Sequence, residues 1–279
     1  MPSRPAADEY PRLQRPLPGP HHQGYEEPHG AGYPHQQLAH CRWPRSRFIG
    51  PQSRYPPPRR VCGANEDGHP NDGIPATASR VYTYPNKQLG ATLWYHDHTH
   101  GITGERVYRG LAGLYLLNDS RHAALRLPRG IYEVPLVIQD RTFDASGQFV
   151  YNLDDMAKEM GVTGDLVLVN GKVNPFFEVA ARKYRFRILN GSNSRQYLLK
   201  LDNGNPLVQI RTDGGLLHRQ QYKTQINIAP AERIDIIIDF TGIPLGTNII
   251  LKNVGGEGRT GDIMQFKVTK PRGKENANS

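Results

Sequence analysis

The hydrophobic pattern of the chain changes at about Val81. From there on, short apolar runs rich in Val, Ile, Tyr and Phe recur, separated by Gly, Asn, Asp and Pro. Such runs predict β-strands; we expect them at residues 79–84, 91–95, 111–117, 133–139, 165–169, 183–189, 196–201, 207–212, 224–228, 233–240, 248–253 and 262–268. Within 183–189, apolar and basic residues alternate, and this period of two indicates a half-buried antiparallel strand.

Helix-forming patterns are scarce. Residues 154–160 are expected to form two helical turns capped by Asp154, and residues 100–108 a short helix after a loop. Asn-Gly pairs at 170–171, 190–191 and 203–204 predict turns, because both residue types tolerate positive φ. Many short strands with few helices predict an all-β sandwich or Greek-key barrel.

The first 60 residues have a different composition. They hold 13 of the 23 prolines, 5 of the 11 histidines and only six residues drawn from Val, Ile, Leu, Met and Phe. A segment of this kind buries too little apolar surface to offset its ordering entropy. We therefore expect residues 1–75 to be a disordered Pro/Arg/His-rich arm.

Charge and cysteine content exclude several classes of protein. The first 60 residues contribute nine Arg against four acidic residues, which is +5 of the net +9, so the folded part is only mildly basic. It carries no Lys/Arg stripe interleaved with aromatic residues, and nucleic-acid binding is not expected. The two cysteines, Cys41 and Cys62, exclude a disulfide-dense scaffold.

No apolar run reaches the ~18 residues needed to span a membrane, and no secretory or twin-arginine signal is visible, so the default expectation is no membrane association and a cytoplasmic location.

Residues 91–119 carry the candidate chemistry. If residues 92–98 form a strand, His96 and His98 lie on one face about 7 Å apart and can each bind one ion of a close metal pair. Neutral imidazole suits copper, zinc and iron. Asp97 points to the other face and is placed for a supporting hydrogen bond. Taken without its context, an H-x-H pair at a strand end is more often an ordinary polar edge.

The context of these histidines resembles a known family. W-Y-H-D-H at 94–98, G-I-T at 101–103 and V-Y-R-G-L-A-G-L-Y-L-L-N-D at 107–119 resemble the end of the first cupredoxin domain of multicopper oxidases such as bacterial spore-coat laccases, bilirubin oxidases and phenoxazinone synthase. The resemblance continues in Y-E-V-P-L-V-I-Q-D-R at 132–141, L-V-N-G-K at 168–172, R-K-Y-R-F-R-I-L-N-G-S at 182–192, D-G-G-L-L at 213–217, A-P-A-E-R-I-D-I-I-I-D-F at 229–240 and I-M-Q-F-K-V-T-K-P at 263–271.

This resemblance implies a cupredoxin-like Greek-key β-sandwich and copper as the cofactor. It implies that residues 76–120 are the C-terminal part of the first cupredoxin domain, that residues 121–271 are the second, and that 272–279 is a tail. His96 and His98 would be ligands of the paired type 3 coppers, with His100 as a further candidate and Asp97 in support. The second domain binds no copper in this family, so Arg233 and Asp235 are expected to form structural ion pairs.

The sequence also departs from the family pattern. Four H-x-H elements build the family's copper cluster, whereas this chain has the one at 96–98, and R-V-C-G-A stands at 60–64 where another is expected. The third domain with its type 1 copper has no counterpart here. We therefore interpret the chain as a truncated laccase-like oxidoreductase. The full family oxidises phenol-type substrates and reduces O2 to water, and this chain alone should show no such turnover.

Two alternatives remain open. One is a non-catalytic cupredoxin-fold module that docks to a cupredoxin partner chain. The other is a mononuclear metal-binding protein that uses His96, His98 and His100. Self-association is also expected, because Leu93, Leu114 and Leu116 are placed on one inner face of the first-domain strands that would lack its usual cover.

Overall fold

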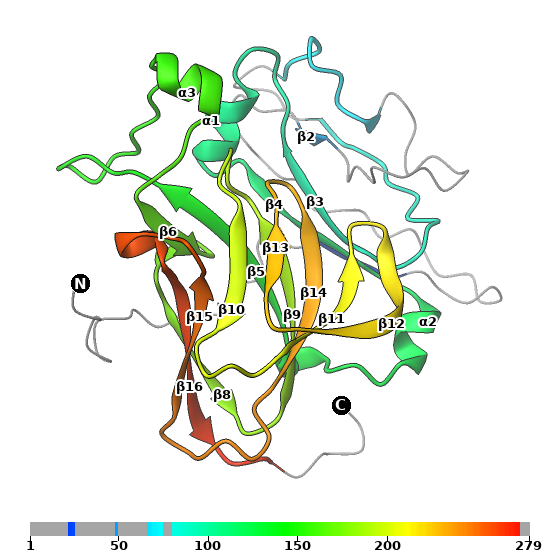
Figure 1. Ribbon diagram of the computed structural model, residues 1–279. Helices are drawn as coiled ribbons and strands as arrows, with labels where there is room; N and C mark the ends of the chain where they lie inside the picture. The colour runs from blue at the N-terminus through cyan, green and yellow to red at the C-terminus, as the bar shows by residue number, and fades with distance from the viewer. Residues whose placement is uncertain (1–21, 26–47, 50–65, 75–79, 274–279) are drawn as a thin grey trace. The chain divides into compact units, whose positions relative to one another are not determined.

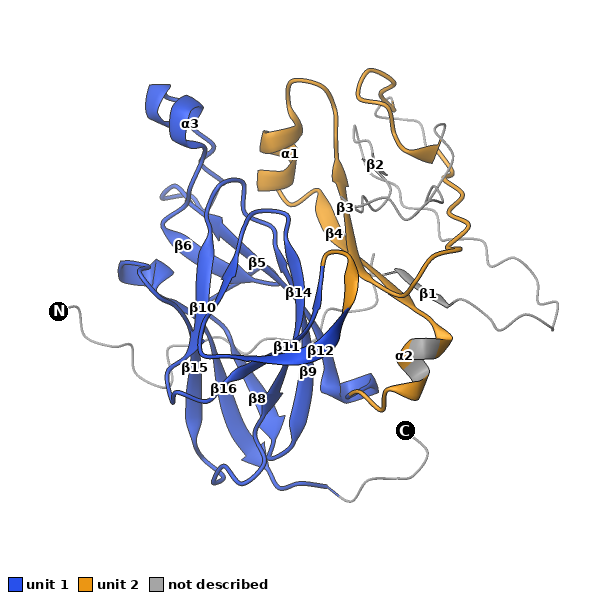
Figure 2. Ribbon diagram, turned by 45° about the vertical axis from the view of Figure 1, so that its right-hand side comes forward, with its two compact units in different colours: residues 1–17, 128–212, 217–279 blue, residues 18–127, 213–216 orange. Residues whose placement is uncertain are grey.

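The computed structural model describes residues 22–25, 48–49, 66–74 and 80–273 (Figure 1). The arm expected at 1–75 therefore lies mostly outside the described residues, as does most of the tail. The chain divides into two compact units. Unit 1 comprises residues 1–17, 128–212 and 217–279, and unit 2 comprises residues 18–127 and 213–216 (Figure 2).

Unit 1 is built from two β-sheets. The five-stranded sheet has the order β13 (Ile226–Ile228), β10 (Tyr197–Leu201), β15 (Asn248–Asn253), β16 (Asp262–Lys270) and β8 (Phe176–Ala180). The seven-stranded sheet has the order β12 (Gly215–Lys223), β11 (Leu207–Thr212), β14 (Arg233–Asp239), β9 (Lys183–Asn190), β5 (Glu133–Arg141), β6 (Leu166–Val169) and β7 (Lys172–Val173). Most pairs are antiparallel, but β5 pairs in parallel with β9, and β8 with β16.

One hydrophobic core holds the two sheets of unit 1 together. Its buried residues come from both sheets and include Leu136 and Phe186 on one side and Leu199 and Phe266 on the other. The Phe186 and Phe266 rings lie 5.1 Å apart. Apolar residues at alternate strand positions thus meet across the layer, and the expectation of an all-β sandwich is confirmed.

Unit 2 contains a smaller sheet. Its central strands β3 (Thr92–Asp97) and β4 (Ala112–Asn118) are antiparallel, and the short segments β1 (His22–Tyr25) and β2 (Phe48–Ile49) pair with β4 and β3. Helix α1 (Thr103–Tyr108) follows β3, as the sequence predicted for 100–108, and α2 (Ser120–Ala124) follows β4.

The helix prediction for 154–160 is also confirmed. Helix α3 spans Asp155–Met160, and the Asp154 carboxylate accepts a hydrogen bond from the backbone N–H of Ala157 at 2.8 Å. This is the N-cap contact that satisfies an otherwise free amide at the helix start. In the part of the chain that the structure describes, no helix is long and apolar enough to cross a membrane.

Several sequence predictions are wrong in detail. Residues 80–84 are not a strand, β8 was missed, and the strand expected at 224–228 is β13 alone, preceded by the long polar strand β12. The inner face assigned in unit 2 also needs correction. Leu93 is paired with Tyr115 and clusters with it, whereas Leu114 is opposite Trp94, so Leu114 and Leu116 lie on the other face of the sheet.

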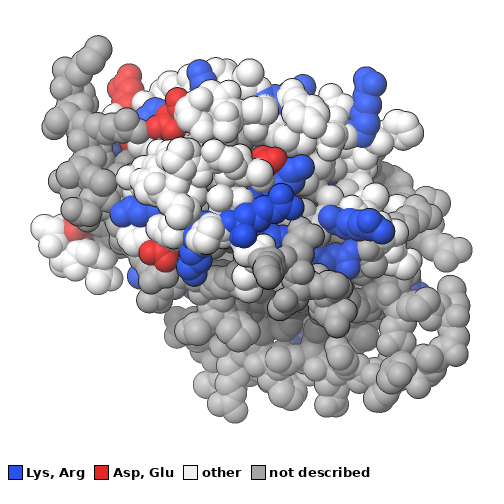
Figure 3. Space-filling view, turned by 90° about the horizontal axis from the view of Figure 1, so that it is seen from below, with Lys and Arg blue, Asp and Glu red and all other residues white. Residues whose placement is uncertain are grey.

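Charged side chains are divided between surface and interior. Figure 3 shows Lys and Arg side chains gathered near the middle of one face of the molecule. In contrast, Arg141, Arg185, Arg187 and Arg211 are among the largest fully buried side chains of the described residues. Burial of a guanidinium requires charged or polar partners, and in unit 1 these come from neighbouring strands.

Candidate metal centre

The two candidate ligands lie at the C-terminal end of strand β3: His96 is its second-to-last residue, and His98 follows its last residue, Asp97. His96 is paired with Ala112 of β4, and Tyr95 is paired with Gly113. A Cβ at Gly113 would lie only 2.5 Å from the Tyr95 hydroxyl oxygen, so glycine is needed for the Tyr95 ring to cross this position. Close pairing with β4 therefore fixes the backbone from which His96 projects.

The orientation of the His96 ring is defined by its backbone neighbour. Its Nδ1 lies 2.8 Å from the carbonyl oxygen of Asp97. A carbonyl oxygen only accepts, so Nδ1 must carry the proton, and the neutral ring then has its lone pair on Nε2. Nε2 is consequently the nitrogen that can coordinate a metal ion.

The electrostatic environment keeps His96 neutral. Burial lowers the pKa of His96, and the neighbouring His98 lowers it further, while the hydrogen bond to the Asp97 carbonyl and the Asp97 carboxylate oppose the shift. Because a metal ligand must be the unprotonated imidazole, this environment suits a ligand at neutral pH.

His98 lies beside His96. The two ring centroids are 5.6 Å apart and the ring planes are inclined by 43°. The Nδ1 atom of His98 is buried and has no hydrogen-bond partner among the described residues. A buried nitrogen without a partner is costly unless a ligand satisfies it, so the pair fits a metal ion.

Asp97 organises the loop that follows β3. Its buried carboxylate accepts hydrogen bonds from the backbone N–H of Thr99 at 3.0 Å and from the Thr99 hydroxyl at 3.3 Å. The Thr103 hydroxyl in turn donates to the Thr99 carbonyl at 2.9 Å. The contact to His96 comes from the Asp97 carbonyl. A supporting role of the Asp97 carboxylate toward a ligand stays a prediction.

His100 does not join the pair. Its side chain is exposed, and its backbone N–H donates to the carbonyl of Pro70 at 3.3 Å. Among the described ranges, no group of three or more His, Cys, Asp or Glu side chains is placed to hold a metal ion. The structure therefore brings together His96 and His98 but not the three histidines of a mononuclear site.

Sequence reasoning missed Trp94. Its indole is stacked on the His96 imidazole with ring centroids 4.4 Å apart and ring planes inclined by 25°. The signal was available in W-x-H, because residues two apart on a strand share a face.

Comparisons with known proteins identify the family. Family models described as multicopper oxidase match residues 63–122 and 132–269. The chain is 47% identical to a laccase of Bacillus subtilis over 206 residues, covering 68% of this chain and 40% of that protein. It is 44% identical to a laccase of Bacillus stratosphericus over 236 residues, covering 76% and 46%. The chain thus spans less than half the length of these relatives.

Solved structures agree with this assignment. The McoA multicopper oxidase from Aquifex aeolicus matches with a TM-score of 0.69 and 34% identity over 85% of this chain and 52% of that one. A laccase from Pediococcus acidilactici matches with a TM-score of 0.70 and 30% identity over 83% and 48%. With two family models that together span most of residues 63–269, this chain belongs to the multicopper oxidase family.

Proposed function

We propose that this chain supplies a copper-binding histidine pair and a second cupredoxin domain to a laccase-like oxidase. Residues 76–120 are assigned to the C-terminal part of a first cupredoxin domain and residues 121–271 to the second. Support comes from the two family matches, at 63–122 and 132–269, and from the change of compact unit between residues 127 and 128. Oxidation of phenol-type substrates with reduction of O2 to water is the activity proposed for the whole oxidase.

The observation that carries this proposal is the adjacent pair of half-buried imidazoles. His96 presents Nε2, and His98 has a buried Nδ1 without a partner. Copper, when bound, supplies the one-electron chemistry by which such oxidases reduce dioxygen. Neutral imidazole nitrogens suit it, and Cu²⁺ heads the affinity order of divalent ions for nitrogen ligands. The part of the reaction that these residues perform is to hold copper at the end of strand β3.

A copper titration tests the assignment. Replacing both ligands, His96→Ala and His98→Ala, should lower the affinity of this site for Cu²⁺ by more than about tenfold, since even loss of an outer partner has an effect of that order. Equilibrium dialysis with metal quantification measures it. The bound copper should be pale, because intense blue colour requires thiolate ligation.

His218→Ala is the matched control, because His218 is an exposed histidine on strand β12. The His218→Ala variant should bind Cu²⁺ with the same affinity as the unmodified chain. If the double variant binds copper as tightly as the unmodified chain, the copper sits elsewhere, and the five histidines of the first 60 residues are the obvious competitors.

Fluorescence distinguishes these two locations. The chain has two tryptophans, and in a Trp43→Phe variant Trp94 is the only emitter. Its ring lies against His96, so copper at the β3 pair should quench the emission strongly. Copper bound only by the arm should leave it largely unquenched.

We also propose that the β3–β4 part of the chain associates with a partner chain or with a second copy of this chain. A fragment of residues 129–271 contains every strand of the two sheets of unit 1. It should therefore fold as a monomer. A fragment of residues 71–271 adds β3 and β4, whose outer edges are then open to pairing with another chain. We expect sedimentation to show self-association of the longer fragment. A cleaner monomer for the longer fragment would contradict this.

A further inference from the structure

Trp94 and His96 form a stacked pair on one face of β3. Both rings project from the same side of the strand, and their centroids are 4.4 Å apart. On that face Trp94 is opposite Leu114, which is fully buried, so the indole has a fixed neighbour across the strand pair. Aromatic rings in such a contact restrict each other's orientation and exclude water between them.

The His96 imidazole is therefore restrained in two directions. The stack with Trp94 fixes the plane of the ring, and the hydrogen bond from Nδ1 to the Asp97 carbonyl fixes its rotation within that plane. A flip of the ring about χ2 would exchange Nδ1 with a carbon atom and break this bond. Neither restraint involves Nε2, so this nitrogen can bind a metal ion.

His98 differs from His96 in this respect. Its Nδ1 has no hydrogen-bond partner among the described residues, and its ring is tilted against His96 instead of stacked on an indole. One member of the pair is thus oriented before any ion arrives, whereas the other has a nitrogen that still lacks a partner. Pre-orientation of a ligand reduces the ordering cost of binding.

We propose that Trp94 is a positioning residue that holds the His96 imidazole with Nε2 presented to copper. This inference rests on the proposed function, because it takes His96 to be a ligand. Trp94 itself is not a ligand; it acts through the ring of His96. Removal of hydrogen-bonding partners that orient a metal-binding histidine typically lowers metal affinity by about 10–100-fold, and we expect loss of the stacked indole to act in the same direction.

The first test needs no copper. Long-range ¹H–¹⁵N NMR of the metal-free protein reports which nitrogen of His96 is protonated. In the unmodified chain we expect the form with the proton on Nδ1. In Trp94→Leu the stack is lost, and we expect a mixture of both forms, whereas Trp94→Phe keeps an aromatic face and should keep the single form. An unchanged single form in Trp94→Leu would overturn the proposal.

The second test is copper affinity. Trp94→Leu should bind Cu²⁺ about tenfold more weakly, and Trp94→Phe should recover most of the loss. Electron paramagnetic resonance should show altered nitrogen hyperfine splitting for Trp94→Leu, a change that loss of stability alone does not produce. Leu93→Val is the control, because it perturbs the other face of β3 and should leave the affinity of the folded fraction unchanged.

The outcomes separate this inference from the proposed function. If Trp94→Leu folds and binds copper with unchanged affinity and spectrum, Trp94 has no positioning role, while the His96/His98 assignment stands. If the His96→Ala/His98→Ala variant loses no copper, the proposed function fails. A change of His96 protonation in metal-free Trp94→Leu would still support the positioning of the ring.

Discussion

Replacing Asp235 with Asn should lower the free energy of unfolding of unit 1 by about 3–5 kcal/mol, the usual effect of breaking a buried ion pair. The Asp235 carboxylate is fully buried and lies among three buried guanidinium groups. The Arg185 Nε donates to its Oδ2 at 3.0 Å, Arg211 Nε lies 3.2 Å from the same oxygen, and Arg187 Nε lies 3.6 Å from it.

The cost arises because positive charge would remain buried without its counter-charge. Glu133 lies 2.7 Å from Arg187 and 3.5 Å from Arg185 but is a single carboxylate for three arginines. Burial lowers the pKa of Arg187, and the negative charge of Asp235 is the largest effect that opposes this shift. Asparagine retains the shape of the side chain and removes that charge.

Urea denaturation measures the change, and Asp239→Asn is the matched control at the far end of the same strand. Asp239 lies 3.7 Å from Lys183, and both side chains are largely exposed. An exposed pair of this kind contributes at most about 1 kcal/mol. If Asp235→Asn were no more destabilising than Asp239→Asn, the arginines would be stabilised by something other than this carboxylate.

This cluster shows where sequence reasoning fell short. The alternation in 183–189 predicted a half-buried antiparallel strand. Strand β9 is antiparallel to β14 as predicted, but it is buried on both faces beyond Lys183 and pairs in parallel with β5 on its other edge. Ion pairs were expected for Arg233 and Asp235; the expectation is confirmed for Asp235 and stays a prediction for Arg233. Its partners come from strands far apart in sequence, and a single sequence does not show which strands become neighbours.

The other missed strands have similar causes. Strand β12 is polar and mostly exposed, so it lacks the apolar signal used to find strands. Strand β8 is short, and its parallel pairing with β16 joins residues about 90 positions apart, such as Phe176 and Gln265. The hydrophobic pattern of a short segment identifies strands that bury one face. Strand β8 is defined instead by its pairing with a distant part of the chain, and β12 by its pairing with β11.

The candidate site also has features that the sequence predicted and features that it did not. His96 and His98 were proposed as ligands from the W-Y-H-D-H motif, and the strand pattern placed them at the end of a strand, where the structure has His96 within β3 and His98 just after it. The stack of Trp94 on His96 and the hydrogen bond to the Asp97 carbonyl depend on side-chain torsions. Torsions of this kind are selected by packing against β4 and the following loop.

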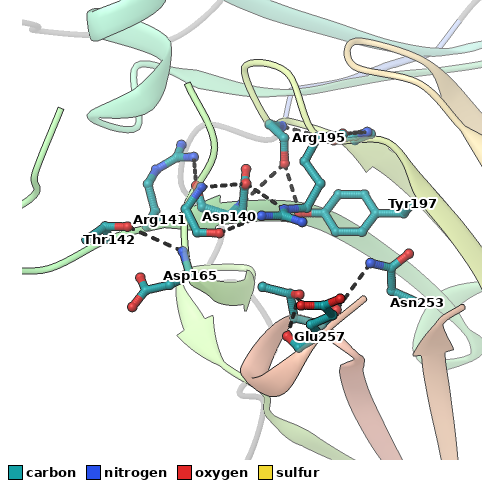
Figure 4. Close-up of polar contacts among 12 residues, drawn as sticks. Asp140, Arg141, Thr142, Asp165, Arg195, Tyr197, Asn253 and Glu257 are labelled. Carbon is teal, nitrogen blue, oxygen red and sulfur yellow. Dashed lines mark hydrogen bonds and ion pairs between the residues drawn. The ribbon is translucent and has the colours of Figure 1, made fainter. Parts of the chain in front are cut away.

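The second large effect is expected at Asp140, at the end of strand β5. Figure 4 shows its buried carboxylate at the centre of a polar network. Its Oδ2 accepts hydrogen bonds from the backbone N–H of Gly164 and from Arg195 Nε, both at 2.7 Å. Arg195 also donates to the Gly164 carbonyl at 2.7 Å. One carboxylate thus joins β5 to two loops, those before β6 and before β10.

The backbone approaches very closely at this point. A Cβ at Gly164 would lie 2.3 Å from the backbone nitrogen of Arg141, so the loop contacts the strand without room for a side chain. The Asp140 N–H donates to the Ser192 hydroxyl at 3.2 Å, and that hydroxyl lies 2.9 Å from the Tyr197 hydroxyl. Burial raises the pKa of Tyr197, and the nearby Asp140 charge raises it further, so Tyr197 stays protonated as part of the network.

Asp140→Ala should therefore destabilise unit 1 by about 3 kcal/mol, because it leaves the Gly164 N–H and the Arg195 guanidinium without their shared acceptor. Urea denaturation gives the global value, and hydrogen exchange of the Gly164 amide gives the local one, which should become markedly faster. Asp165→Asn is the control, since Asp165 lies in the same loop with an exposed side chain. That substitution should change stability by no more than about 0.5 kcal/mol. Equal stability and equal Gly164 protection in Asp140→Ala and Asp165→Asn would show that the loop is held to β5 by packing and not by this carboxylate.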